Sequence, residues 1–187
     1  MGIVTALSRA DLITAKDLFT VGELGPCELI DGRVVFVDPA TAAQGLLATA
    51  VASELGQYVR PRKHGRVLLG GVGIVTRRYP DTVRAADVAF ISHACLPQLQ
   101  RSYLEVAPEL VVEIMSPSDR WQDIRSKLDD YFSIGVERVW IVEPERRTVL
   151  VYRSSTDLRE FGEDDVLKGE GVLEGFELPV AELFAEL

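Results

Sequence analysis

Residues 109–127 read ELVVEIMSPSDRWQDIRSK and decide the fold of the chain. Residues 109–115 are mostly apolar, several of them β-branched, and are bounded by prolines, so they predict a buried strand. Glu113 lies in the middle of this strand. Period-two alternation places its side chain on the face of Val111 and Met115, where an ionised carboxylate is costly unless a cation meets it. This cost is the first indication of a functional site.

A helix is expected to follow the strand, with Ser116 or Ser118 as its cap and Gly135 as its end. Its apolar stripe is expected to consist of Trp121, Ile124, Leu128 and Phe132. Glu113 lies about 10 Å back from the end of the strand, and Lys127 lies about 12 Å along the helix. If the helix folds back over the strand, the two side chains are level, so a carboxylate and a lysine can share one site.

Length and composition indicate one globular domain over residues 1–187. The chain has 187 residues, of which 47% are hydrophobic, and this is enough for a sizeable core. Its start carries no basic leader followed by an apolar run, and its longest small apolar stretch, residues 46–52, is too short to span a bilayer. We therefore expect a soluble cytoplasmic protein with no membrane partner.

Cysteine and histidine usage argues against two classes of site. Cys27 and Cys95 lie far apart and in no metal-binding or redox spacing, so free thiols are expected rather than a disulfide. His64 and His93 are the only histidines in the sequence. This disfavours a histidine-rich zinc site and a Ser-His-Asp triad.

The formal net charge is −9, but the charge is unevenly distributed. Residues 60–84 hold seven basic residues and one acid, whereas residues 154–187 hold ten acids and two basic residues. The overall acidity argues against binding nucleic acid over the whole surface. The basic segment has two interpretations: a localised patch that faces phosphates, or the solvated rim of a hairpin, which sequence alone slightly favours.

Short-range signals predict the remaining elements. Asp31-Gly32 predicts a hairpin turn, and Gly70-Gly71 predicts a bulge or kink in a strand over residues 65–76. A strand, helix, strand series over residues 109–142 predicts a parallel pair. The other expected elements are helices at 14–19 and 41–58, strands at 85–91, 138–142 and 148–152, a loop at 92–108, and an apolar segment at 178–184. We expect a mixed α/β fold.

Asp87 and Glu113 are the only charges inside the two central strand runs. If these strands are neighbours, the two carboxylates converge and raise each other's pKa unless a cation binds between them. Oxygen ligands without histidine or thiolate suit Mg²⁺ or Mn²⁺. The alternative is two separate residues, with Asp87 in a local turn and Glu113 paired with an arginine. Spacing alone does not decide between them.

Other polar residues have simpler interpretations. Lys127 and Asp123 are spaced i,i+4 and suit a surface ion pair on the helix. Glu28, in a short first strand, is more often a solvated strand residue than a ligand. Tyr131 is expected to pack at the edge of the apolar stripe. Gln44 lies on the first long helix.

Together these motifs resemble the Uma-type endonuclease family of the PD-(D/E)XK nuclease superfamily. The resemblance covers most of the chain and rests on Glu28-Leu29-Ile30-Asp31-Gly32, Asp87, Glu113-Ile114-Met115-Ser116-Pro117-Ser118-Asp119, Asp123, Lys127, Tyr131, residues 135–144 and residues 149–153. It implies a restriction-endonuclease-like αβββαβ core, a mixed sheet flanked by helices, with an added N-terminal hairpin and C-terminal strands. It also implies a metal site of Asp87, Glu113 and the backbone carbonyl of Ile114.

Three positions depart from the family pattern. The superfamily lysine usually lies two residues after the acid, where this chain has Met115, and the resemblance implies that Lys127 replaces it. Ala86 stands where the family usually has proline, which is expected to be a mild change. Gln44 stands where related sequences commonly have histidine, so any catalytic role of the first long helix stays open.

The leading hypothesis is an endonuclease that hydrolyses phosphodiester bonds in DNA with Mg²⁺ or Mn²⁺ as cofactor. Asp87 and Glu113 would hold the metal, and Lys127 would orient the attacking water or stabilise developing charge. Asp123 would position Lys127. Because double-strand cleavage usually needs two active sites, a homodimer is expected, formed through an exposed strand or the hairpin.

Two alternatives stay open. A catalytically inactive module with the nuclease fold would bind nucleic acid or protein, and the acidic surface, Met115 and Gln44 motivate this alternative. The other is a metal-dependent hydrolase of a small phosphate ester. Glu28 and Gln44 are supporting site candidates in the nuclease hypothesis.

Overall fold

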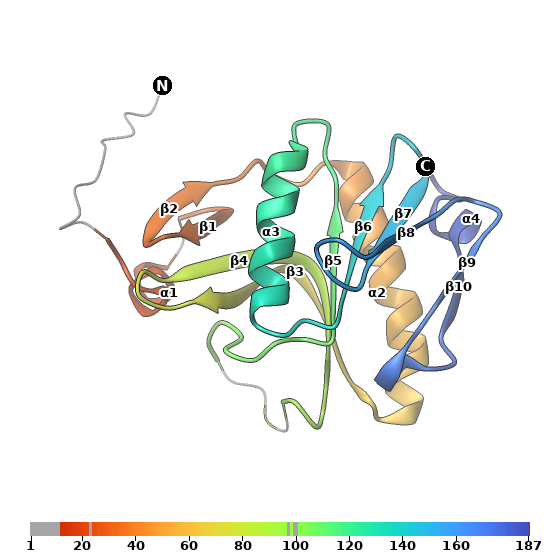
Figure 1. Cartoon of the computed structure of the whole chain (residues 1–187), viewed down its shortest axis with the longest axis horizontal. Coiled ribbons are helices and arrows are strands. Elements are labelled where there is room, and N and C mark those ends of the chain that lie inside the picture. Colours follow the sequence, from red (N-terminus) through yellow and green to blue (C-terminus); the bar gives the residue numbers. More distant parts are fainter. Residues whose placement is uncertain (1–11, 23, 97, 99–100) are drawn as a thin grey trace.

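The computed structural model describes residues 12–22, 24–96, 98 and 101–187, and it centres on a mixed sheet of eight strands (Figure 1). The strand order is β2-β1-β4-β5-β6-β7-β8, and β3 also pairs with β4. The strands are β1 (Cys27–Ile30), β2 (Arg33–Phe36), β3 (Gly65–Arg77), β4 (Thr82–Ser92), β5 (Leu110–Ile114), β6 (Arg138–Glu143), β7 (Thr148–Tyr152) and β8 (Leu158–Phe161). A second sheet has two strands, β9 (Val166–Lys168) and β10 (Glu177–Pro179).

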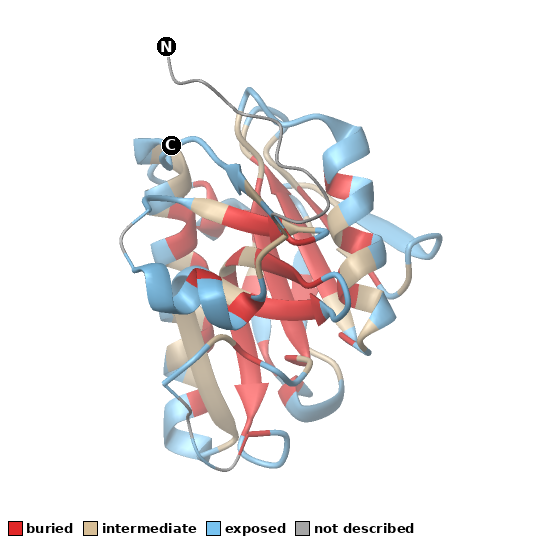
Figure 2. Cartoon of the chain, turned by 90° about the vertical axis from the view of Figure 1, so that its left-hand side faces the viewer, coloured by how far each residue is buried: buried red, intermediate tan, exposed pale blue. Residues whose placement is uncertain are grey.

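The two long helices cover opposite faces of the large sheet (Figure 1). The helices are α1 (Ala15–Val21), α2 (Ala42–Arg62), α3 (Trp121–Ser133) and α4 (Val180–Leu183), and Gly171–Leu173 forms a short 3-10 helix. Leu47 and Leu55 of α2 pack on one face, whereas Ile124 and Leu128 of α3 pack on the other. Figure 2 shows that the buried residues concentrate in the strands between the helices. The predicted mixed sheet flanked by helices is confirmed.

The central strands follow the expected directions. β5 and β6 run parallel and are joined by α3, whereas β4 and β5 run antiparallel. A crossover helix is needed because neighbouring parallel strands cannot be joined by a tight turn. The parallel pair, the hairpin turn at Asp31-Gly32 and the bulge at Gly70-Gly71 are therefore confirmed predictions.

The sheet divides along one edge of β4. On its other edge β4 pairs with β3 over most of its length. On the divided edge it pairs with β1 at Val83 and with β5 from Val88 onward. Between these two pairings the backbone meets side chains instead of a strand, and the Ala85 N–H donates to Glu28 Oε1 at 3.1 Å. We call residues 84–87 the β4 fork.

The start of α3 differs from the prediction. The helix begins at Trp121, and its cap residue, Arg120, makes no side-chain capping hydrogen bond. Ser116 and Ser118 bond to each other at 2.9 Å, and Asp119 closes a turn by accepting from the Ser116 N–H at 2.7 Å. The expected serine cap is wrong because this turn delays the helix. As the first helical residue, Trp121 is 40% exposed and does not belong to the buried stripe.

The basic residues of segment 60–84 do not form one patch. Arg84 is buried at the β4 fork, which neither interpretation of this segment foresees. Arg77 and Arg78 lie near the β3–β4 turn and form ion pairs with nearby aspartates. The remaining basic residues lie at the C-terminal end of α2 and the start of β3. The segment is therefore divided between the two ends of the β3–β4 pair and its interior.

In the described part of the chain, no helix has the length and apolar character needed to cross a membrane. Cys27 and Cys95 are free thiols, as predicted. The domain predicted over residues 1–187 begins with residues 1–11, which lie outside the described residues, as does most of the start inspected for a leader.

Candidate functional site

Strand pairing brings Asp87 and Glu113 together. β4 and β5 pair with Val88 opposite Val112, and the same register continued by one residue sets Asp87 opposite Glu113. Here a side chain replaces the backbone acceptor of the strand pair. The Ile114 N–H donates to Asp87 Oδ2 at 2.7 Å. The two carboxylates thus meet at the β4 fork.

Lys127 reaches the same place from α3. Its Nζ donates to Glu113 Oε2 at 2.8 Å and lies 3.3 Å from Glu28 Oε1. The fully buried Tyr131, one turn further along α3, donates from its hydroxyl to Glu113 Oε1 at 2.6 Å. Tyr131 packs in the apolar cluster under α3, as expected, but its bond to Glu113 was not foreseen. Both oxygens of Glu113 accept a hydrogen bond from α3.

Glu28 is buried, contrary to the expectation of a solvated strand residue. It is 4% exposed, and its Oε2 accepts from Arg84 Nη1 at 2.8 Å. The expectation fails because Arg84 of β4 and Lys127 of α3 both reach Glu28, so its charge is met inside the fold. Glu28 therefore belongs to the same cluster of charges as Glu113.

Gln44 also lies at the site, at the N-terminal end of α2. Its Nε2 donates to the carbonyl of Ile114 at 2.9 Å, and its Oε1 accepts from the Thr41 N–H at 2.9 Å. The capping box with Thr41 therefore fixes which end of the amide faces the carbonyl. By contrast, Asp123 is exposed, and in the described ranges Lys127 forms ion pairs only with Glu28 and Glu113. The expected pair of Asp123 with Lys127 is wrong.

The charges at the site perturb one another in different directions. Burial, reinforced by the charge of Asp87, raises the pKa of Glu113 to about 7 against the opposing effect of Lys127. Burial also raises the pKa of Asp87, with the nearby carboxylates of Asp119 and Glu28 adding to it. Burial alone would lower the pKa of Lys127, but the charges of Glu113 and Glu28 outweigh it and hold this pKa above its usual value.

The pKa of Glu28 is shifted in the opposite direction. Its burial is outweighed by the positive charges of Lys127 and Arg84, which hold its pKa below the ordinary value. Nearby positive charges thus outweigh the burial of Glu28 and stabilise its ionised form. At Asp87 and Glu113 the nearby positive charge does not outweigh the effect of burial. A cation at the site would serve Asp87 and Glu113.

A divalent cation fits the oxygen donors at this place. Asp87 uses Oδ2 for its bond to the backbone, and no described residue donates to its Oδ1. The Ile114 carbonyl accepts from Gln44 and keeps a second lone pair. The described residues hold no group of three or more Asp, Glu, His or Cys side chains suited to a metal. Two carboxylates and one carbonyl, completed by water and substrate, match the way Mg²⁺ binds.

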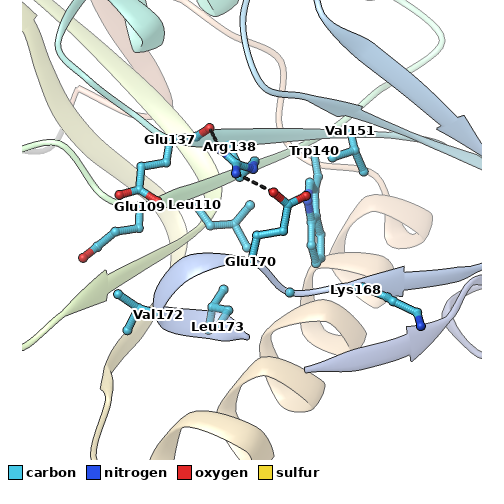
Figure 3. Close-up of a pocket in the computed structure, with 11 residues that line it drawn as sticks. Glu109, Leu110, Glu137, Arg138, Trp140, Val151, Lys168, Glu170, Val172 and Leu173 are labelled. Carbon is cyan, nitrogen blue, oxygen red and sulfur yellow. Dashed lines mark hydrogen bonds and ion pairs between the residues drawn. The ribbon is translucent and has the colours of Figure 1, made fainter. Parts of the chain in front are cut away.

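A small pocket elsewhere has different chemistry (Figure 3). It lies where β6 begins, beside β9 and the 3-10 helix, and Arg138 there pairs with Glu170 at 2.5 Å. Leu110 and Arg138, at the starts of the parallel strands β5 and β6, line it, whereas Glu113 lies near the other end of β5. The pocket is therefore separate from the carboxylate site, and two of its charged groups, Arg138 and Glu170, already pair with each other.

Sequence reasoning missed Arg84, the bond from Tyr131 to Glu113, and Asp119. Asp119 is near enough to Asp87 to raise its pKa. Strict alternation would put Arg84 and Asp87 on opposite faces of β4, yet Arg84 bonds to α3 and Asp87 influences Lys127. The alternation fails at the β4 fork, opposite the bulge at Gly70-Gly71 of β3, which the sequence predicted without indicating its effect on β4. Tyr131 could have been found, because it is one turn from Lys127.

Comparisons with known proteins identify the family and the fold of the chain. The model of the family Uma2, described as "Putative restriction endonuclease", matches residues 18–181. The crystal structure of a "putative nuclease belonging to DUF820" from Anabaena variabilis is similar with a TM-score of 0.79 and 19% sequence identity, over 92% of this chain and 98% of that chain. At this identity the likeness establishes the fold. No curated protein matches the sequence.

Proposed function

The chain belongs to the Uma2 family, and from this premise we propose that it is an endonuclease that hydrolyses phosphodiester bonds in DNA with a bound Mg²⁺ or Mn²⁺. One observation carries the proposal: Asp87 and Glu113 lie side by side at the β4 fork with the ammonium of Lys127 on Glu113. One buried and one partly buried carboxylate, both with a raised pKa, are the arrangement that a hard cation stabilises.

Asp87, Glu113 and the carbonyl of Ile114 would hold the cation. When bound, such a cation polarises a phosphate and lowers the pKa of an attacking water. The residues of the chain supply the rest of the site. Gln44 orients the Ile114 carbonyl, and Tyr131 orients the Glu113 carboxylate by binding the oxygen that Lys127 leaves free.

Lys127 supplies the positive charge that the usual superfamily position, here Met115, does not. Its ammonium has three protons to donate and only two carboxylate partners, Glu113 and Glu28, among the described residues. A third donor is thus available for a phosphate oxygen or for the attacking water. Negative charge that develops on the phosphate during hydrolysis would be stabilised by it.

The test is cleavage of supercoiled plasmid in Mg²⁺ and in Mn²⁺ by wild type, Asp87→Asn and a control, Asp129→Asn. Asp129 is an exposed acid on α3, so its variant matches the charge change away from the site. We expect Asp87→Asn to lower the cleavage rate at least about a hundredfold and Asp129→Asn to leave it unchanged. Cleavage by Asp87→Asn at the wild-type rate would overturn the proposal.

We further propose a homodimer that forms through β2. This strand is an edge of the large sheet, and Val35 and Phe36 are 42% and 65% exposed. An apolar edge strand is suited to pairing with another strand. Sedimentation at micromolar concentration is expected to show a dimer in wild type and a monomer in Phe36→Glu. A monomeric wild type would contradict this.

A further inference from the structure

We propose that Arg84 is a positioning residue that, together with Glu28, holds the ammonium of Lys127 at the site. The inference rests on the proposed nuclease function, because that function gives the ammonium its task. It assigns to β1 and β4 the role that sequence spacing suggested for Asp123, which is exposed and does not pair with Lys127 in the described part of the chain.

All three nitrogens of the Arg84 guanidinium donate inside the fold. Nε donates to Asp130 Oδ2 at 2.7 Å, Nη1 to Glu28 Oε2 at 2.8 Å and Nη2 to Ser126 Oγ at 2.8 Å. The side chain is only 4% exposed. Because a guanidinium is planar and its donors are fixed in a fork, few positions satisfy all three bonds. Arg84 therefore joins β1, β4 and α3 at one point.

The two α3 partners of Arg84 enclose Lys127 in sequence. Ser126 and Asp130 are four residues apart, which is about one turn of helix, and Lys127 lies in that turn. Bonds to two successive turns restrain both the rotation of α3 and its sliding along the sheet. A lysine side chain is long and flexible, so the position of the helix decides whether its ammonium reaches Glu113.

Glu28 completes the arrangement by holding the ammonium directly. Its Oε2 binds Arg84, and its Oε1 accepts from the Ala85 N–H and lies 3.3 Å from Lys127 Nζ. Glu28 is not one of the proposed metal ligands. It can therefore retain the ammonium when a cation neutralises Glu113, which is when Lys127 would otherwise lose its main partner.

The attachment of α3 by Arg84 is needed because the lysine of this chain lies on a helix. A lysine two residues after Glu113 would be placed by β5 itself, but that position is Met115 in this chain. A lysine on a separate helix needs the helix to be fixed to the sheet near the site. Arg84, on the strand that also carries Asp87, provides that attachment.

The variants must weaken the Arg84 contacts without unfolding the protein. Arg84→Gln leaves the Glu28 carboxylate in the interior without its cation and is expected to destabilise the fold. Asp130→Ala instead removes one contact from the helix side, where the Asp130 side chain is 22% exposed. Asp129→Ala is the matched control, because it removes the neighbouring exposed acid from the same helix.

The first measurement is the rate at which acetic anhydride acetylates Lys127, read by peptide mass spectrometry on metal-free protein. This acetylation rate does not depend on cleavage, so the measurement tests the inference even if the wild type has no nuclease activity. We expect the amine to react about tenfold faster in Asp130→Ala than in wild type and no change in Asp129→Ala. Equal rates in Asp130→Ala and wild type would overturn the inference.

The second measurement is a double-mutant cycle on kcat and KM for DNA cleavage at saturating Mn²⁺. A positioning role predicts that Asp130→Ala lowers kcat about tenfold with KM unchanged, and that it has no further effect once Lys127→Ala is present. Asp130→Glu is expected to recover part of the loss. Additive losses in the double variant would mean a merely structural role and would overturn the inference.

The outcomes separate the two proposals. Wild type that cleaves DNA while Asp130→Ala matches it in both measurements refutes only the role of Arg84. If wild type neither cleaves DNA nor binds Mn²⁺, the nuclease proposal is refuted. If Lys127 is nevertheless acetylated faster in Asp130→Ala than in wild type, Arg84 remains the residue that holds Lys127.

Discussion

The five residues of β5 are divided between two faces that differ in chemistry. Leu110, Val112 and Ile114 point toward α2 and lie in an apolar cluster of the core. Val111 and Glu113 point toward α3, where Glu113 meets an ammonium and a tyrosine hydroxyl. The difference teaches that β5 can be buried without charged residues, since its face toward α2 packs entirely without them.

The charged face costs stability that the apolar face does not. Taking a carboxylate and an ammonium out of water is expensive, and apolar replacements of a buried ion pair are often neutral or stabilising. Glu28, Arg84, Lys127 and Glu113 form such a buried group. Both faces carry an apolar cluster that stabilises the fold, but only the α3 face adds this charged group, so we propose that the α3 face is the functional one.

The largest effect on stability is expected on the α2 face. Leu55 is fully buried in that cluster, and Leu55→Ala should lower the free energy of unfolding by about 2–5 kcal/mol. Mn²⁺ affinity of the folded protein should stay unchanged, because Leu55 lies about three turns along α2 from Gln44, the residue of this helix that bonds at the site. Urea unfolding and calorimetry check the two expectations. A loss of Mn²⁺ binding in folded Leu55→Ala would break the separation of the faces.

The pH dependence of stability should report the α3 face. The pKa of Glu113 is about 7 in the folded protein against an ordinary 4.5, so the folded state binds more protons between these values. The free energy of unfolding of metal-free protein should therefore fall by about 3 kcal/mol as the pH rises from 4.5 to above 7.

Glu113→Gln removes this titration and should flatten the slope in urea unfolding measured across that window. Glu28, whose pKa is lowered, acts in the opposite sense, because its stabilisation is lost as the pH falls below 4.5. A wild type and a Glu113→Gln variant with identical slopes would contradict the assignment of the charged face.

A smaller effect is expected at Gln44, which lies on α2 but bonds to the Ile114 carbonyl at the site. Gln44→Glu keeps the oxygen that accepts from Thr41 but turns the amide that faces Ile114 into a carboxylate. Both variants lose the amide that donates to the Ile114 carbonyl, but only Gln44→Glu supplies a third carboxylate, so its Mn²⁺ affinity should be about tenfold higher than that of Gln44→Leu. Calorimetric titration checks both variants. Equal affinity in Gln44→Glu and Gln44→Leu would show that Gln44 lies outside the cation's reach.

The meeting of Glu113 and Lys127 was predictable because it depends on regular geometry. Strand rise and helix rise alone set the two residues level, and the observed distance is 2.8 Å. The contact of Asp87 with β5 was foreseen as one alternative, and the β4–β5 register selects it.

Irregular geometry defeated the prediction of the other partners. Arg84 and Asp87 both lie near α3 because β4 departs from strict alternation at the fork, and Glu28 is buried where Arg84 of β4 and Lys127 of α3 meet β1. Trp121 fits the periodicity of α3, yet it lies in the first turn, where the turn closed by Asp119 has already displaced the start of the helix. Periodicity describes positions within an element and cannot say where a neighbouring element ends.

The most direct test of the central claim is calorimetric titration of Mn²⁺ into wild type and Glu113→Gln. Both proteins should be folded, and the substitution keeps the size of the side chain while it removes the charge proposed to hold the cation. We predict a binding signal in wild type and its loss in Glu113→Gln. Equal Mn²⁺ binding by the two proteins would contradict the claim that the charged face of β5 is a metal site.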